Sequence, residues 1–512
     1  MGFAKNLLVL LALVAGVNAQ ASDEKKPVAA QTTQISDLWG LKGERWTSQS
    51  RLPDFSYAGY HSGEKAIPRY PQTANVQRFG AKGDGLADDT QAFKAAIAAT
   101  TTGAIYVPSG RYKITDFIYL RKSGVVLRGA GADKTRLVFP KPLYEVVPDG
   151  SATSDGKVTT AYSFNFAYLT IQGNVGERVL AAITQPAKRG DIELTVTSGR
   201  GIAVGQSIQI RVQEDAEQTL KTFLYAGDPG DISNGKPLET RMVVKVVKIA
   251  GDKITLNRPL RFDTRASWRP EVLAFEPSVS ETGIEDIGFE FPEVPYPGHF
   301  NERGFNAIEL RGAANCWVKN VKLHNADMGV QFADDATFNT VDGVVISAYA
   351  GRGNEKGHHA FQFKKSQDNV VTHFDIQTKF IHDLSVENAS GNVYADGRGE
   401  DLSFDHHADT PYENLYTNLN CGLGKNIWRS GGGKGLGRHA AAWTTFWNIQ
   451  AALPFKLPAA DFAPAMINLI GVNTPAAAQK DPAGVWVEPL TGGAISPDNI
   501  WRAQLAKRLA KP

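Results

Sequence analysis

Short strands with a shared pattern recur along the middle of the chain, and this repetition restricts the fold more than any other feature. Successive copies begin at Ile284, Val318, Val341 and Val371, and each has a second apolar residue three positions later. The starts lie 34, 23 and 30 residues apart. A single short strand cannot bury its apolar face alone, so the copies must stack as rungs. The pattern predicts an all-β chain built as a parallel β-helix, with a β-sandwich as the alternative.

The composition excludes several other classes of protein. The 512 residues include 55 Lys and Arg and 53 Asp and Glu, which is too even a balance for a protein that wraps nucleic acid. Two cysteines cannot form a disulfide scaffold. Hydrophobic residues make up 42% of the chain, which is too many for a disordered protein. We therefore expect a folded protein with neither nucleic acid nor a membrane as its partner.

The two ends of the chain carry recognisable signals. Residues 1–21 have a positive start, a short apolar run and small residues at the end, as in a secretory signal peptide cleaved after Ala19 or Ala21. The apolar run is too short to cross a bilayer, so we expect a secreted or periplasmic protein. Residues 500–509 predict a short amphipathic helix, with polar residues before it and cations at its end.

A specific resemblance lies in the first quarter of the chain. The segment Asn-Val-Gln-Arg-Phe-Gly-Ala-Lys-Gly-Asp-Gly at 75–85 is followed by Asp-Asp-Thr at 88–90 and a helical run at 91–99. Two glycine-bounded strands follow at 103–112 and 124–131. This order resembles the opening of the pectate-lyase-like superfamily, which includes polysaccharide lyases, polygalacturonase-type hydrolases and phage tailspikes. The resemblance implies a right-handed single-stranded parallel β-helix whose first helix covers the end of the stack. It implies no single activity.

The pattern also divides the chain into parts. Alternating apolar residues such as Ile208, Ile210 and Val212, with turn residues between them, indicate a small β module inserted into the helix. This module either shapes one wall of a cleft or is a surface loop. The predicted parts are a signal peptide (1–21), an N-terminal extension (22–70), the first part of the β-helix with its cap (71–186), the inserted module (187–263), the main β-helix with the active-site cleft (264–455), and a C-terminal extension with a short α-helix (456–512).

Histidine marks the segment in which we expect the chemistry. Seven of the ten histidines fall between residues 358 and 439. Imidazole titrates near neutral pH and serves in proton transfer and in metal binding. The same window contains Gly431, Gly432 and Gly433, whose lack of side chains lets a ligand approach the backbone closely. It also contains tryptophans, whose aromatic faces suit sugar binding.

One strand in this window combines histidine with carboxylates. In Asp-Leu-Ser-Phe-Asp-His-His at 401–407, the apolar Leu402 and Phe404 are expected to point inward. Alternation then places Asp401, Ser403, Asp405 and His407 together on the outer face. Such a set can act as acid and base, can hold a histidine in one tautomer, or can bind a metal. Asp401 and Asp405 are accordingly candidate ligands for Ca²⁺.

The neighbouring residues supply positive charge and further contacts. Residues 425–439 include four bases and no acid, which suits the carboxylate or sulfate groups of an anionic polysaccharide. The predicted catalytic residues are His407, His359, Asp405, Asp401 and Lys434. The predicted substrate-binding residues are Arg429, Arg438, His439, His406, His358 and Trp428.

The resemblance implies carbohydrate chemistry, and three functions remain open. In a lyase, His407 or His359 removes the proton beside a uronate carboxylate, while a cation such as Arg429 stabilises the charge that develops. In a polygalacturonase-type hydrolase, Asp401, Asp405 and Asp409 carry the reaction. The third function is a non-catalytic, glycan-binding β-helix. We expect the lyase, because histidines and cations cluster in one window and the hydrolase motifs are not intact.

Overall fold

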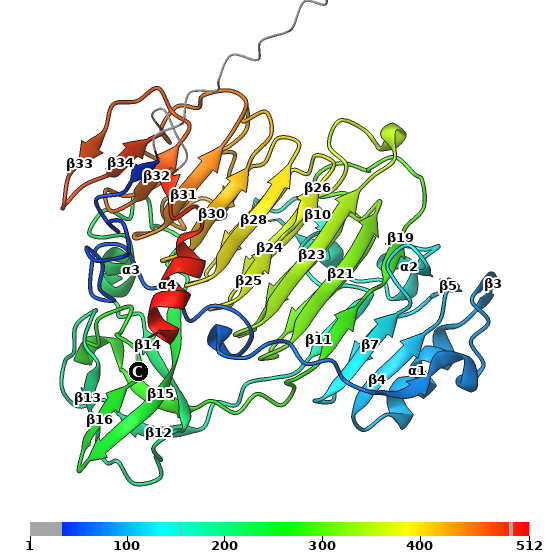
Figure 1. The fold of residues 1–512 in the computed structure, drawn as a ribbon, viewed down its shortest axis with the longest axis horizontal. Helices are drawn as coiled ribbons and strands as arrows, with labels where there is room; N and C mark the ends of the chain where they lie inside the picture. The colour runs from blue at the N-terminus through cyan, green and yellow to red at the C-terminus, as the bar shows by residue number, and fades with distance from the viewer. Residues whose placement is uncertain (1–32, 154, 491–494, 511–512) are drawn as a thin grey trace, which may run out of the picture.

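The computed structural model describes residues 33–153, 155–490 and 495–510. The predicted signal peptide at 1–21 lies outside these residues. Within them, no helix is both long enough and apolar enough to cross a membrane. The chain forms a right-handed parallel β-helix that carries one inserted module (Figure 1), as the repeated strands predict.

A long parallel sheet forms one side of the stack, and only β33 and β34 pair antiparallel in it. Its strands are β2 (Gln72–Asn75), β3 (Asp84–Asp88), β4 (Gly103–Val107), β5 (Gly110–Lys113), β7 (Val125–Gly129), β8 (Thr135–Val138), β18 (Gly283–Glu285), β19 (Gly288–Glu290), β21 (Trp317–His324), β23 (Thr340–Ser347), β25 (Val370–Thr372), β26 (Asp375–Ile376), β28 (Val393–Gly399), β30 (Leu415–Asn420), β31 (Thr445–Gln450), β32 (Asn468–Val472), β33 (Gln479–Lys480) and β34 (Trp486–Pro489).

The register of this sheet confirms the repeat found in the sequence. Ile284 pairs with Val318, Val318 with Val341, and Val341 with Val371. All four side chains are buried in the main core. The column continues through Tyr394, whose ring stacks on the next coil. Apolar residues at constant register therefore form the continuous interior that the stacking requires.

A second parallel sheet lies across the core and carries the histidine-rich strands. Its members are β6 (Ile118–Leu120), β11 (Leu169–Gln172), β20 (Asn306–Arg311), β22 (Met328–Ala333), β24 (His359–Lys364), β27 (His382–Glu387) and β29 (Phe404–His406). Val330, Phe361, Leu384 and Phe404 align on its inner face. Alternate residues consequently point away from the core.

Buried asparagines connect the coils just before the strands of the long sheet. The side-chain oxygen of Asn369 accepts a hydrogen bond from the backbone of Asn339, and Asn392 and Asn414 repeat the pattern in the next coils. The residue before each of these asparagines has a positive φ, as at Asp368 with φ 53°. The ladder therefore satisfies backbone groups at a sharp turn inside the protein.

Short elements cap the first coils of the stack and cover one face (Figure 1). Helix α1 (Thr90–Ala99) packs on the first coils through Phe93 and Ile97, as the sequence predicts for a cap. Helix α4 (Ile500–Leu509) confirms the predicted C-terminal helix, and it packs with the N-terminal extension over the long sheet. Other small elements are β1 (Gln34–Ile35), paired with β35 (Ile495–Ser496), helix α2 (Leu143–Val146), and the hairpin of β9 (Gly150–Ala152) and β10 (Val158–Thr160). Short 3-10 helices lie at Tyr60–Gly63, Val76–Phe79, Ala161–Ser163, Ala266–Trp268 and Ala350–Arg352.

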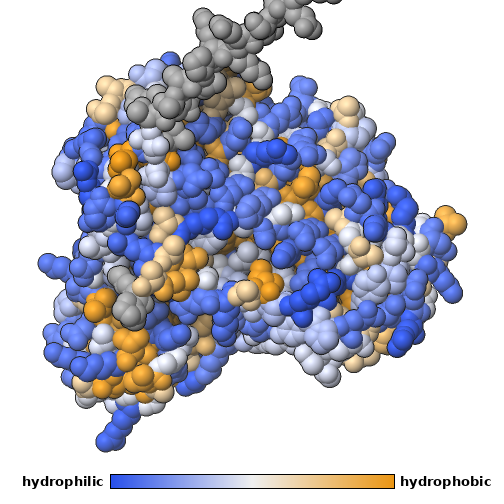
Figure 2. All heavy atoms as spheres, in the orientation of Figure 1, coloured by the Kyte–Doolittle hydropathy of each residue, from blue (hydrophilic) through white to orange (hydrophobic). Residues whose placement is uncertain are grey.

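The inserted module is an antiparallel sheet with its own core. It contains β12 (Val179–Ala182), β13 (Glu193–Thr195), β14 (Ser207–Gln213), α3 (Thr219–Leu224), β15 (Glu239–Ala250), β16 (Lys253–Leu256) and β17 (Glu271–Ala274). The sheet thus runs beyond the range 187–263 that the sequence suggests. Figure 2 shows a largely hydrophilic molecular face with hydrophobic residues gathered over this module at lower left.

A buried ion cluster attaches the module to the helix. The Asp368 carboxylate, on the turn before β25, accepts hydrogen bonds from Arg258 at 2.6 Å and from Arg261. All three side chains are at most 6% exposed. Tyr412 of the helix also packs into the module core. The module is therefore held by both charge and apolar contact.

Candidate functional site

Polar residues form a row on the outer side of the second sheet, where alternation turns them away from the core. Gln331 pairs with Gln362, Gln362 with Ser385, and Ser385 with Asp405. All four side chains are buried. Buried polar side chains need partners, and the contacts around Asp405 show how that requirement is met.

Asp405 is the centre of a hydrogen-bonded network. Its Oδ2 accepts from His407 Nδ1 at 2.8 Å and from Ser385 Oγ at 2.6 Å. Its Oδ1 accepts from the backbone N–H of Gly431 at 2.7 Å. Ser385 Oγ in turn accepts from Nδ1 of His359 at 2.8 Å. The carboxylate therefore fixes His407 directly and His359 through one hydroxyl.

The Asp405 and His407 pair is strongly polarised. Burial raises the pKa of the Asp405 carboxyl, but the imidazoles of His382 and His407 and the hydrogen bonds lower it more, so the group is ionised. Burial lowers the pKa of His407, but the charge of Asp405 outweighs this effect and raises it above 6.5. His407 is 21% exposed, whereas Asp405 is fully buried. The exposed imidazole is therefore the member of the pair that can reach a ligand.

The glycine-rich loop lies directly against His407. A Cβ atom on Gly431 would lie 2.5 Å from the His407 ring, and one on Gly432 would lie 2.5 Å from its carbonyl oxygen. Gly432 also has φ +112°, which side chains rarely adopt. Glycine here allows close backbone approach, and the same loop carries Lys434, which is exposed.

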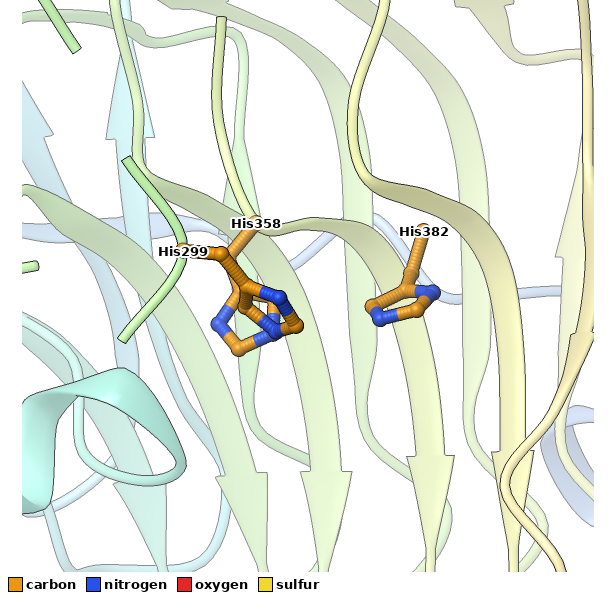
Figure 3. Close-up of side chains that lie close together, drawn as sticks. All are labelled: His299, His358 and His382. Carbon is orange, nitrogen blue, oxygen red and sulfur yellow. The ribbon is translucent and has the colours of Figure 1, made fainter. Parts of the chain in front are cut away.

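Three more histidines gather beside this network (Figure 3). His299 lies in the loop between β19 and β20, His358 directly precedes β24, and His382 begins β27. Each offers one ligand atom, and these atoms lie within 4.8 Å of one another. Burial lowers the pKa of His299 to about 4 and that of His382 to about 3, and it lowers that of His358 well below 6.5. All three imidazoles are therefore neutral at neutral pH.

Charged groups surround the exposed edge of the site. Lys364 lies at the end of β24, with its Nζ 3.9 Å from Glu387 and 3.2 Å from the side-chain oxygen of Asn165. Arg429 pairs with Glu355 at 2.5 Å, and both side chains are 34% exposed. The cations Lys364 and Arg429 thus lie around the histidines at the solvent boundary.

His406 was predicted to bind substrate, and the structure contradicts this role. Its ring points into the core, where it packs against Tyr416, Phe446 and Phe462. The alternation that sends Asp405 and His407 outward necessarily sends His406 inward. Burial lowers its pKa to about 4, so this histidine is a neutral part of the core.

Other predicted residues lie away from the Asp405 network. Asp401 accepts hydrogen bonds from Lys425 N–H and the Asn426 side chain, so the structure does not bring it together with Asp405. Arg438 donates from Nη2 to both carboxylate oxygens of Asp228 in the inserted module. His439 bonds to the carbonyl of His406 at 3.1 Å, and Trp428 packs against Phe404 and Phe446. Arg438 and Trp428 are therefore bound within the protein.

The sequence did not identify four further residues of the site: His299, His382, Lys364 and Ser385. One signal was present for His382: it follows His359 by 23 residues, the interval that separates Val318 from Val341. The two histidines are indeed paired across β24 and β27. No comparable interval identifies His299, because an irregular loop brings it to the site.

A cavity of about 410 Å³ lies between the inserted module and the helix. The module contributes Lys236 and Arg241, and the helix contributes Lys365 and Asn388. Lys365 and Asn388 directly follow Lys364 and Glu387, so this cavity begins beside the site. The module therefore forms one wall of a hollow at the ends of β24 and β27.

Comparisons with known proteins agree with this fold. Residues 73–164 match the family model described as rhamnogalacturonase A/epimerase, pectate lyase-like. The match and the fold support the pectate-lyase-like superfamily. Alginate lyase 7 from Azotobacter vinelandii is 36% identical over 109 residues, which are 20% of this chain and 12% of that protein. Mannuronan C5-epimerase AlgE4 from the same organism is 32% identical over 114 residues, or 20% of this chain and 19% of that protein.

These matches cover only part of each protein. The chain therefore spans less than a fifth of the length of either relative. Among solved structures, the tailspike protein gp49 of Pseudomonas phage LKA1 is similar with a TM-score of 0.43 and 14% identity, covering 74% of this chain and 64% of that one. The family-model match at residues 73–164 agrees with the resemblance found in the sequence at residues 75–131.

Proposed function

We propose that this protein acts on a uronate-containing polysaccharide and cleaves it by β-elimination. The observation that carries the proposal is the partly exposed His407, which is held at Nδ1 by the buried Asp405 at 2.8 Å. Because Nδ1 donates to the carboxylate, the lone pair of the neutral ring lies on Nε2. The relatives named alginate lyase and mannuronan epimerase support a uronate substrate.

The proposed step uses His407 as the base. Its Nε2 takes the proton from the carbon that bears the uronate carboxylate, and the electron pair of that C–H bond forms a carbon–carbon double bond. The carbon–oxygen bond on the adjacent carbon breaks, and the leaving oxygen keeps its electron pair and takes up a proton from water, while His407 later releases its proton to solvent. Negative charge develops on the uronate carboxylate, where Lys364, Arg429 and Lys434 offer the nearby cations.

The carboxylates favour elimination over hydrolysis. A glycoside hydrolase needs one carboxyl group as acid and another as base or nucleophile. Here Asp405 is fully buried and accepts three hydrogen bonds, Asp401 is bound to the 425–426 backbone and side chain, and Asp409 pairs with Lys236 at 2.8 Å. All three carboxylates are thus engaged in hydrogen bonds or ion pairs within the protein. His407, in contrast, is partly exposed and has a ring nitrogen, Nε2, that is available to a substrate.

The test is incubation of the protein with a panel of uronate polysaccharides, including alginate and polygalacturonate. Ultraviolet absorbance of an unsaturated product together with new reducing ends supports elimination. New ends without absorbance would show hydrolysis and overturn the mechanism. Retention on immobilised polysaccharide without any reaction would leave a binding protein and overturn catalysis.

An epimerase would be recognised by a separate readout. The same proton abstraction followed by reprotonation from the opposite face gives no new ends, but it incorporates deuterium from D₂O into the polymer. Deuterium uptake without cleavage would therefore overturn elimination while retaining the base. For a variant that removes the proposed base His407, the matched control is His373→Ala. His373 is also a partly exposed histidine, but it lies on the other sheet and pairs there with Asp342.

A further inference from the structure

We infer that His299, His358 and His382 form a binding site for one divalent transition metal ion of the zinc type. The three residues come from separate coils and converge on one point beside the second sheet (Figure 3). Their ring centroids are 4.6 Å apart for His299 and His358, and 5.5 Å apart for His358 and His382. Ligand atoms within 4.8 Å of one another are close enough for one ion to contact all three after small side-chain shifts.

The hydrogen-bonding state of these rings points to a missing partner. His299 Nε2, His358 Nδ1 and both ring nitrogens of His382 are buried and have no hydrogen bond. The His358 and His382 side chains are 2% and 4% exposed. Buried polar atoms without partners are costly and uncommon, and here four of them gather on three adjacent imidazoles. A cation would satisfy Nε2 of His299 and Nε2 of His382, whereas the Nδ1 atoms of His358 and His382 lie nearest to carboxylates.

Two carboxylates stand behind the proposed ligands. Glu302 Oε1 lies 3.4 Å from Nδ1 of His358, and Asp405 Oδ1 lies 3.3 Å from Nδ1 of His382. A metal-binding imidazole commonly directs its second nitrogen toward a carboxylate, which orients the ring. Glu302 is itself held by Ser163 at 2.8 Å. These contacts leave the opposite nitrogen, Nε2, of His358 and His382 for the ion.

The donor set selects the class of metal. Imidazole nitrogens suit Zn²⁺, Co²⁺ and related ions, whereas Ca²⁺ and Mg²⁺ take oxygen ligands. Three protein ligands also leave a coordination position open, as in catalytic zinc sites. The alternative group of His382, Asp405 and His407 fits less well, because Asp405 already accepts from Ser385, His407 and Gly431.

The position of the site gives it a role, and this role rests on the function proposed above. The ring of His382 lies 5.0 Å from that of His407 between centroids. An ion beside the base would supply positive charge to the uronate carboxylate through its open position. This charge would add to that of Lys364 and Arg429.

The experiment measures metal binding in the absence of polysaccharide. The full-length protein is treated with a chelator, dialysed, and titrated with Zn²⁺ and with Co²⁺. Metal content and calorimetry give the stoichiometry, and the visible spectrum of the Co²⁺ form reports nitrogen ligation. We expect one equivalent bound by the wild type and by His373→Ala. His299→Ala, His358→Ala and His382→Ala should each weaken binding by at least about tenfold.

His299→Ala is the decisive variant, because His299 lies on a loop and its loss leaves the sheets intact. Circular dichroism and thermal unfolding verify that each variant is folded. The inference is overturned if folded wild type binds no stoichiometric Zn²⁺ or Co²⁺, if it binds only Ca²⁺, or if His299→Ala and His382→Ala both bind like wild type. A protein that binds zinc but cleaves no polysaccharide would retain this site and overturn only the proposed function.

Discussion

Asp405 Oδ2 accepts a 2.8 Å hydrogen bond from Nδ1 of His407, two residues further along the same outer face. Ser385 and the Gly431 backbone donate to the same carboxylate, so its position is fixed from three sides. A buried, ionised carboxylate behind a partly exposed imidazole sets the tautomer of that imidazole. The arrangement is typical of a residue prepared to accept a proton, and it leads to the first two predictions.

Replacing His407 by alanine should reduce turnover of the polysaccharide by roughly 10²–10⁴-fold, the usual contribution of a positioned general base. The fold should be retained, since His407 is partly exposed and follows β29. Product absorbance measured at saturating substrate tests this, with His373→Ala as the control. Equal rates for wild type and His407→Ala would assign the base to another group.

Asp405→Asn should lower kcat by at least about tenfold, while KM changes by less than about threefold. The asparagine amide cannot hold the His407 tautomer as the carboxylate does, so kcat falls. The amide has the size of the carboxylate and is buried away from the substrate, so KM changes little. Initial rates over a range of substrate concentrations separate the two constants. A rise in KM with unchanged kcat would mean that Asp405 acts only on substrate binding. Asp375→Asn, which alters a surface pair with Arg398, is the control.

The interior of the stack could be predicted because it obeys one rule. Equivalent apolar residues such as Val318 and Val341 recur in each coil, and only one register buries them all. The same alternation correctly placed Asp405 and His407 outside, since Leu402 and Phe404 are inside. It also places His406 inside, and the prediction of a substrate contact there failed for that reason.

The rest of the site depends on the lengths and paths of the loops between strands, which the repeated strand pattern does not specify. His299 reaches His358 because the loop between β19 and β20 folds back over the second sheet. Whether Lys364 lies beside Glu387 depends on how many residues each coil uses for its turns. Arg438 looked like a free cation, but it is bound by Asp228 of a module whose docking could not be read from local spacing.

Asn392→Ala should lower the free energy of unfolding by roughly 2–4 kcal/mol, because it leaves several buried groups unpaired. The Asn392 oxygen accepts from the backbone and side chain of Asn369, and its amide donates to the carbonyls of Ser366 and Ser390. Denaturant unfolding measures the change. Asn354→Ala, in an exposed loop, should stay near wild type. A similar stability for both variants would show that the ladder contributes little.

Asp368→Asn should destabilise the protein by about 3–5 kcal/mol, since it leaves two buried guanidinium groups without their counter-charge. Arg258 and Arg261 come from the inserted module, so loosening of that module should precede global unfolding. Hydrogen exchange of β14 and β15 and thermal unfolding test both parts. Asp375→Asn removes an exposed pair and should cost less than about 1 kcal/mol. Comparable losses in the two variants would contradict the importance of the buried cluster.

The same cluster predicts how stability depends on pH. Burial raises the pKa of Asp368, but the charges and hydrogen bonds of Arg258 and Arg261 outweigh this and place it below 3.8. A group with a lowered pKa in the folded state stabilises the protein above its unfolded pKa, and this contribution disappears as the pH falls through the folded value. The stability difference between wild type and Asp368→Asn should therefore be constant from about pH 7 to 5 and shrink below about pH 4. Denaturant unfolding of both proteins across this range measures it, and a difference that grows in acid would reverse the assigned sign.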